Sequence, residues 1–163
     1  MTDLIYPVMH VLHLLLAIIW IGGLAFITIL ILPMIVKMAH PLEKVLLFQR
    51  IEHRFAPMAR VYSALVGVTG FIMFFSLGLQ DVLFTKAGHP LLFMIVVWIF
   101  WIIMLFGLEP LIVKKMLDRL ASEKGEGMEI EDVFNRMNVL HWVLLALSLA
   151  AAAAGVIFAH GFI

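Results

Sequence analysis

Four long runs of apolar residues dominate this sequence of 163 residues and limit the folds that it can adopt. The runs cover residues 8–36, 55–79, 90–113 and 138–158. Each run is long enough to cross the hydrocarbon of a bilayer as a helix, which takes about 20 residues. A helix also satisfies its own backbone hydrogen bonds, which lipid cannot do. The sequence therefore predicts an all-α, integral membrane four-helix bundle that forms a single domain over residues 1–163.

The composition excludes several classes of protein. Hydrophobic residues make up 64% of the chain and charged residues 13%, whereas soluble domains have about 45–50% and about 25%. A small soluble fold buries only about two-thirds of its surface, so it could not hide this much apolar area. Eleven basic and eleven acidic residues cancel, which argues against nucleic acid as a partner. The absence of cysteine excludes disulfides, iron–sulfur clusters and cysteine nucleophiles.

Basic residues gather in the two connections that lie on one side of the expected membrane. Lys86 stands alone on the opposite side. The other ten are Lys37, Lys44, Arg50, Arg54, Arg60, Lys114, Lys115, Arg119, Lys124 and Arg136. The positive-inside rule then places both termini outside, in the periplasm, and both basic connections in the cytoplasm. A cleaved secretory signal is not expected, because no basic segment precedes the first run.

The connections themselves also show local patterns. Residues 41–54 are amphipathic and predict a short helix on the inner membrane surface, with Val45, Leu46 and Phe48 toward lipid. Residues 114–120 are expected to extend the third helix into the cytoplasm. Residues 122–132 are polar and contain glycine, so they predict a flexible loop.

Seven histidines are unusual in so apolar a chain, because ionisable residues inside a membrane are costly and mark function. His53 opens the second run and His141 lies about one turn into the fourth, so the two share a depth near the inner surface. Neutral imidazole ligates haem iron in many cytochromes. In a helix bundle such ligands come from facing helices. We therefore predict a haem b held by His53 and His141.

A second group of histidines lies near the outer surface. His10 and His13 are one helical turn apart on one face of the first run, and His89 and His160 lie at the outer ends of the third and fourth runs. His13 or His10, with His160 or His89, could hold a second haem. For His40, His89 and His160 a simple interfacial position is the alternative.

Several other residues fit a haem near the inner pair. Arginine suits the carboxylates of haem propionates through paired hydrogen bonds, and three arginines lie at this depth: Arg54, Arg60 and Arg136. Arg60 could instead pair with Glu109. Gly67 belongs to a stripe of small residues that would make room for a macrocycle or allow close helix packing. Trp20 lies deeper than an interfacial belt and would pack between helices or against a ring.

Copper is the competing metal. Met34, Met38 and His40 lie close together at the end of the first run, and Met9 adjoins His10. Soft thioethers favour Cu(I), although methionine is also a common filler of apolar gaps. Glycine-rich phosphate loops, serine-nucleophile elbows and zinc-protease motifs are absent from the sequence, which argues against nucleotide-using and hydrolytic enzymes.

The first run reads His13-Leu-Leu-Leu-Ala-Ile-Ile-Trp20-Ile-Gly22-Gly23, followed by Pro33. It resembles the first helix of a group of small bacterial membrane proteins that includes the copper-resistance D (CopD) membrane domain and the HemJ-type protoporphyrinogen oxidases. The segment from Arg54-Phe55-Ala56-Pro57 to Thr69-Gly70 and the segment Arg136-Met-Asn138 are similar too. The resemblance implies a haem b site that uses the histidine of the first helix, here His13. It also implies a multi-pass protein of the bacterial cytoplasmic membrane.

The HemJ-type enzymes carry a lysine in their third helix, and this sequence has none between residues 90 and 113. We therefore predict a membrane b-type cytochrome with one or two haems, which exchanges electrons with the quinone pool or a redox partner protein. The alternatives are a CopD-like copper transport protein, a HemJ-like haem-dependent oxidase, and a small subunit that anchors a larger redox complex. A homo-oligomer is compatible with each.

Overall fold

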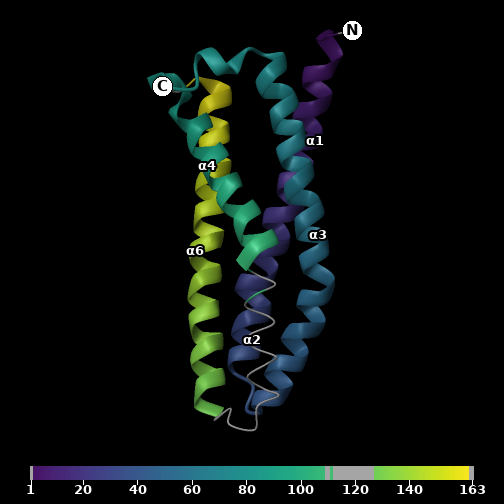
Figure 1. Cartoon of the computed structure of the whole chain (residues 1–163), viewed down its shortest axis with the longest axis vertical. Helices are drawn as coiled ribbons and strands as arrows, with labels where there is room; N and C mark the ends of the chain where they lie inside the picture. Colours follow the sequence, from purple (N-terminus) through teal and green to yellow (C-terminus); the bar gives the residue numbers. More distant parts are fainter. Residues whose placement is uncertain (1, 109–110, 112–126, 162–163) are drawn as a thin grey trace.

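A computed structural model shows long helical columns that run alternately up and down, with both termini at one end (Figure 1). It describes residues 2–108, 111 and 127–161. In chain order its elements are α1 (Thr2–Phe26), the π-helical turn η1 (Ile27–Ile31), α2 (Leu32–Val36), α3 (Pro41–Ser76), the short 3-10 helices η2 (Leu79–Asp81) and η3 (Lys86–Gly88), α4 (His89–Ile103), the π-helical turn η4 (Met104–Leu108) and α6 (Gly127–His160). We call the end opposite the termini the inner end, since its charges predict a cytoplasmic position.

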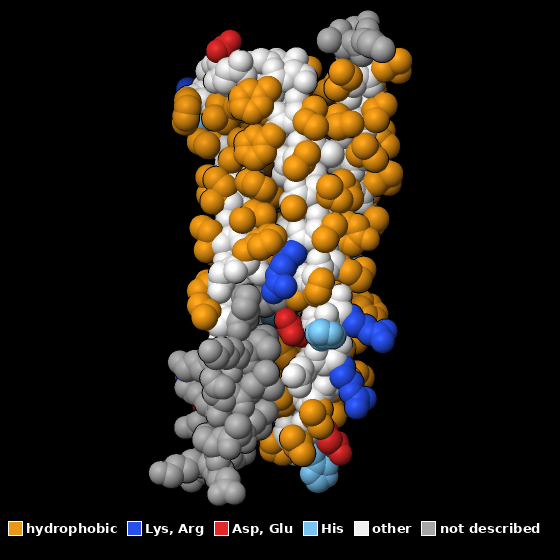
Figure 2. Space-filling model, turned by 45° about the vertical axis from the view of Figure 1, so that its right-hand side comes forward, with side chains coloured by type: hydrophobic (Ala, Val, Ile, Leu, Met, Phe, Trp, Pro, Cys, Tyr) orange, Lys and Arg blue, Asp and Glu red, His pale blue; other side chains and the backbone are white. Residues whose placement is uncertain are grey.

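Among the described residues, four segments are long and apolar enough to cross a membrane: Leu4–Val36, Pro41–Ser76, Lys86–Leu108 and Ile130–His160. The prediction of an all-α, multi-pass membrane protein is thereby confirmed. Apolar side chains cover the surface of much of the bundle, and charged side chains gather near the inner end (Figure 2). The orientation of the bundle stays a prediction from the positive-inside rule.

The predicted surface helix over residues 41–54 is wrong, because these residues form the first turns of α3. Val45 is only 1% exposed, and the Phe48 ring packs edge-on against Phe134 of α6, with ring centroids 5.8 Å apart. The apolar stripe at the start of α3 therefore packs against α2 and α6. Packing against these helices buries the stripe better than a position at the lipid surface.

The fourth helix also begins earlier than predicted, at Gly127 rather than at residue 138. The predicted flexible loop over residues 122–132 is therefore wrong for the part from Gly127 onward, while residues 114–120 and Glu109 lie outside the described residues. Ile130, Phe134 and Met137 recur at helical spacing, and Phe134 is fully buried against α2 and α3. This packing extends the helix beyond the apolar run.

The π-helical turn η1 lets the first helical column continue through Pro33. Proline lacks a backbone N–H, and its ring clashes with the carbonyl four residues earlier. In η1 the N–H of Leu32 donates to the carbonyl of Ile27, five residues back, so the helix widens just before the proline. The column therefore continues as α2 to Val36.

Lys44 caps the end of α2. Its Nζ donates a hydrogen bond of 2.9 Å to the carbonyl of Val36, the last residue of α2, and the side chain is only 5% exposed. We expect Lys44→Met to lose about 1–3 kcal/mol of stability, because a partly buried carbonyl then lacks a donor. Thermal unfolding in detergent would show this as a lower Tm. Lys37→Met, at an exposed position beside it, should leave the Tm unchanged; equal melting of both variants would contradict the cap.

Candidate cofactor site

An apolar cavity of about 310 Å³ lies in the inner half of the bundle, and residues of all four columns line it. Trp20 lines it from α1, Ala56 and Ala59 from α3, Trp101 from α4, and His141 from α6. Its volume falls at the lower end of the range for small-molecule sites, about 300–1,000 Å³. The cavity is therefore the natural candidate for a bound cofactor.

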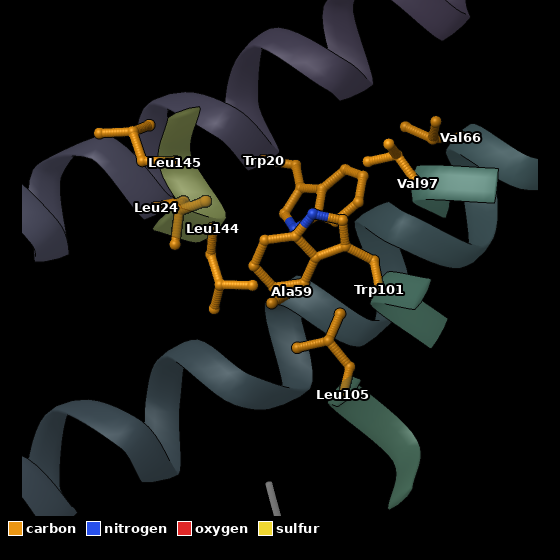
Figure 3. Packing of buried hydrophobic residues seen from close by; sticks show 9 residues of the cluster. All are labelled: Trp20, Leu24, Ala59, Val66, Val97, Trp101, Leu105, Leu144 and Leu145. Carbon is orange, nitrogen blue, oxygen red and sulfur yellow. The ribbon is translucent and has the colours of Figure 1, made fainter. Parts of the chain in front are cut away.

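Two tryptophans form a rigid wall of this cavity. The rings of Trp20 and Trp101 meet edge to face, with centroids 5.3 Å apart (Figure 3). The Trp101 indole N–H donates to Ser148 Oγ at 3.0 Å, and Ser148 Oγ donates to the carbonyl of Leu144 at 2.8 Å. Trp20, predicted to contact a cofactor, thus does line the cavity, and hydrogen bonds fix its aromatic partner in place.

His141 is the only histidine that lines this cavity in the part of the chain that the structure describes. Its half-buried ring has Nδ1 at 2.9 Å from the carbonyl of Met137. A carbonyl only accepts, so Nδ1 carries the proton and Nε2 keeps its lone pair. Histidines that bind metals in proteins usually hold their second nitrogen in this way. His141 is therefore prepared to ligate a metal through Nε2.

His53 does not share this cavity. Its side chain is exposed and lines a separate hollow on the surface of α3, together with Gln49 and Arg50. The structure therefore does not support the predicted pairing of His53 with His141 around one haem. The depth was matched, but the helix face was not. Glu52 lines the cavity. Each residue turns an α-helix by about 100°, so the next side chain, that of His53, lies on a face outside the cavity.

In the outer half, His13 joins α1 to α3. Its Nδ1 donates to the carbonyl of Val66 and to Thr69 Oγ1, both at 3.0 Å, and Gly70 leaves room for the ring. The second nitrogen of His13 is therefore free to accept or ligate, as in His141. His10 is exposed, with its ring 5.6 Å from that of Tyr6.

His89 and His160 are also exposed, at the outer ends of α4 and α6. Within the described ranges, no three His, Cys, Asp or Glu side chains lie close enough together to hold a metal ion. The outer histidines therefore do not form a metal cluster, and a second haem at His13 stays a prediction.

Of the three predicted arginines, one lies at the cavity. Arg136 lines it from α6. Arg60 instead donates from Nε to the carbonyl of Leu105 at 2.9 Å, within η4, and Arg54 is exposed. Glu109, the predicted partner of Arg60, is not among the described residues.

Gly67 serves packing rather than a cofactor. A Cβ at this position would overlap the indole of Trp98, whose N–H donates to the carbonyl of Ser63 at 2.8 Å. The space beside Gly67 is therefore filled by Trp98, which favours close packing, the second of the two predicted roles.

Among the cavity residues that escaped the sequence analysis, three carry a carboxylate or a thioether: Glu52, Met104 and Met137. Helical spacing could have found two of them. Glu52 shares a stripe with Ala56 and Ala59, and Met137 precedes His141 by four residues. Met104 begins η4, and no local pattern marks a π-helical turn.

Comparison of the chain with protein-family models, with curated proteins and with solved structures finds no match. The resemblance of the first helix to the CopD and HemJ-type proteins therefore stays a prediction from its motif. The functional argument depends on the cavity itself.

Proposed function

We propose that this protein is a membrane b-type cytochrome in which His141 is an axial ligand of a haem iron in the inner cavity. The observation that carries the proposal is a half-buried imidazole that lines an apolar cavity, with Nδ1–H bound to a backbone carbonyl. Bound haem would supply a one-electron iron couple.

The donor set favours a cofactor that brings most of its own ligands. The described residues hold no group of three or more His, Cys, Asp or Glu side chains that could bind a bare metal ion. A porphyrin supplies four nitrogens and needs only one or two axial ligands from the protein. One histidine with an available Nε2, such as His141, can therefore supply the axial ligand that a haem needs.

The walls of the cavity suit a flat apolar ring with charged edges. Trp20 and Trp101 supply aromatic surface, and the small side chains of Ala56 and Ala59 leave space. Arg136 is exposed and also lines the cavity, so its guanidinium can bind a propionate at the rim through charge-assisted hydrogen bonds. We infer that Arg136, and neither Arg54 nor Arg60, has this role.

The residues around the cavity would also set the reduction potential. Burial among apolar side chains disfavours added charge, while the charges of Arg136 and Glu52 act in opposite directions. The Met137 carbonyl makes the His141 imidazole a stronger donor. The electron donor or acceptor would be a quinone of the membrane or a redox partner protein.

Absorbance and metal analysis test the proposal directly. Protein expressed with added haemin and purified in detergent should show Soret and alpha bands of haem b in a reduced-minus-oxidised spectrum. Iron should be present at one equivalent per chain, or two if His13 holds a second haem. Colourless protein without iron would contradict the proposal.

One observation favours copper as the second candidate. Met104, Met137 and His141 line the same cavity, and thioethers with imidazole form a ligand set that suits Cu(I). The predicted group at Met34, Met38 and His40 does not line this cavity. Copper without iron or porphyrin absorbance would support a copper-handling protein instead.

A further inference from the structure

We propose that the exposed face of α3 around Arg50, His53 and Arg54 binds the headgroup of an anionic phospholipid. This inference concerns the surface of the bundle and does not depend on the function proposed for the cavity.

The three side chains form one donor surface. Arg50 and Arg54 are four residues apart on α3, so their Cβ atoms lie about 5–6 Å from each other. His53 adjoins Arg54, and all three side chains are exposed. A hollow of about 420 Å³ lies beside them, lined by Leu46, Gln49, Arg50, Glu52 and His53. Arg54 lies one turn from Arg50 and outside this lining, so a phosphate at the hollow meets the donors of Gln49, Arg50 and His53 with a second guanidinium nearby.

Within the described part of the chain, nothing neutralises these cations. Among the residues that the structure describes, the side chains of Arg50, His53 and Arg54 form no hydrogen bond or ion pair. The carboxylate of Glu52 lies next to them in sequence, yet it also makes no ion pair in this part of the chain. The positive charge is therefore available to an external anion.

Their depth matches that of lipid phosphates. From Arg54 to Ser76, where α3 ends, the helix rises about 33 Å at about 1.5 Å per residue. The hydrocarbon of a bilayer is about 30 Å thick, and headgroups extend it to about 40–45 Å. Arg54 therefore lies at the hydrocarbon boundary when Ser76 lies at the other, and Arg50 lies one turn further, among the headgroups.

The surface on the membrane side of this level is largely apolar (Figure 2). Charged and histidine side chains occupy one face near the inner end, and apolar side chains cover the surface directly above them (Figure 2). After Arg54, the exposed apolar residues of α3 include Met58, Val61 and Leu65, within about three turns of it. Acyl chains can lie along these residues while the phosphate meets the arginines.

Lipid titration by native mass spectrometry tests the inference on the full-length protein in detergent. Wild-type protein should retain phosphatidylglycerol more tightly than phosphatidylcholine. The Arg50→Gln/Arg54→Gln variant should bind phosphatidylglycerol about 25-fold more weakly. The expected factor is about fivefold for each arginine, since a cation near the lipid surface contributes about 1 kcal/mol.

Lys86→Gln is the matched control, because it removes an exposed cation at the other end of the bundle and should leave this affinity unchanged. Circular dichroism checks that each variant is folded, and the exposed positions make unfolding unexpected.

Equal binding by wild type and double variant, or no preference for the anionic lipid, would overturn the inference. Full competition by inorganic phosphate would also overturn it, by showing a site for the free ion. None of these measurements requires haem, so their outcome is separate from that of the proposed cytochrome function.

Discussion

Replacing His141 with alanine should remove the haem b bands that we expect from the inner cavity. All of the absorbance should disappear if the cavity holds the only haem, and about half should remain if His13 holds another. The reason is that His141 is the only histidine lining the cavity among the described residues, so no second imidazole replaces it. The reduced-minus-oxidised spectrum of purified variant and wild type is the measurement.

His53→Ala is the control for this experiment. His53 lies at a similar depth, but it is exposed and does not line the cavity, so its loss should leave the spectrum unchanged. The opposite result, with His53 essential and His141 dispensable, would contradict the proposed site. It would indicate that haem binds at the exposed face of α3 instead.

A rescue experiment separates ligation from folding. His141→Ala leaves a space beside the cavity, and added imidazole can occupy it and ligate the iron. Return of the bands with imidazole would show that the variant is folded and lacks only its ligand. If the variant is folded by circular dichroism and the bands neither fall nor respond to imidazole, His141 is not the ligand.

The sequence alone predicted what lipid imposes. A segment inside a bilayer must be helical, apolar and about 20 residues long, so four helices followed from hydropathy without knowledge of their contacts. The depth of His141 and the deep position of Trp20 followed in the same way. These predictions depend on one dimension, the distance along the membrane normal.

The predictions that the structure does not support depend on the faces of the helices and their partners. His53 has a suitable depth, yet a single residue separates it from the stripe of α3 that lines the cavity. The apolar residues of 41–54 can pack on lipid or on protein, and only the neighbouring Phe134 shows which surface is present. Small residues are equally ambiguous, because Gly67 can border a cofactor or an indole.

Replacing Gly67 with alanine should cause a large loss of stability in the outer half of the bundle. The new Cβ would overlap the Trp98 indole, which cannot move freely. Its N–H is bonded to the Ser63 carbonyl at 2.8 Å, and its ring packs edge-on against Phe71 at 5.4 Å between centroids. Overpacking and loss of this buried hydrogen bond together should cost about 2–5 kcal/mol.

Gly22→Ala is the matched control, because nothing lies within 4 Å of a Cβ placed at that position. Alanine favours a helix over glycine, so this variant should melt at the same temperature as wild type or slightly higher. Thermal unfolding in detergent compares the two variants. Adding Trp98→Phe to Gly67→Ala should recover part of the lost Tm, because a phenyl ring is smaller than an indole. If both glycine variants melt at the same temperature, the missing Cβ of Gly67 is not needed to accommodate the Trp98 indole. In that case, the space beside Gly67 could again hold the ring of a bound cofactor.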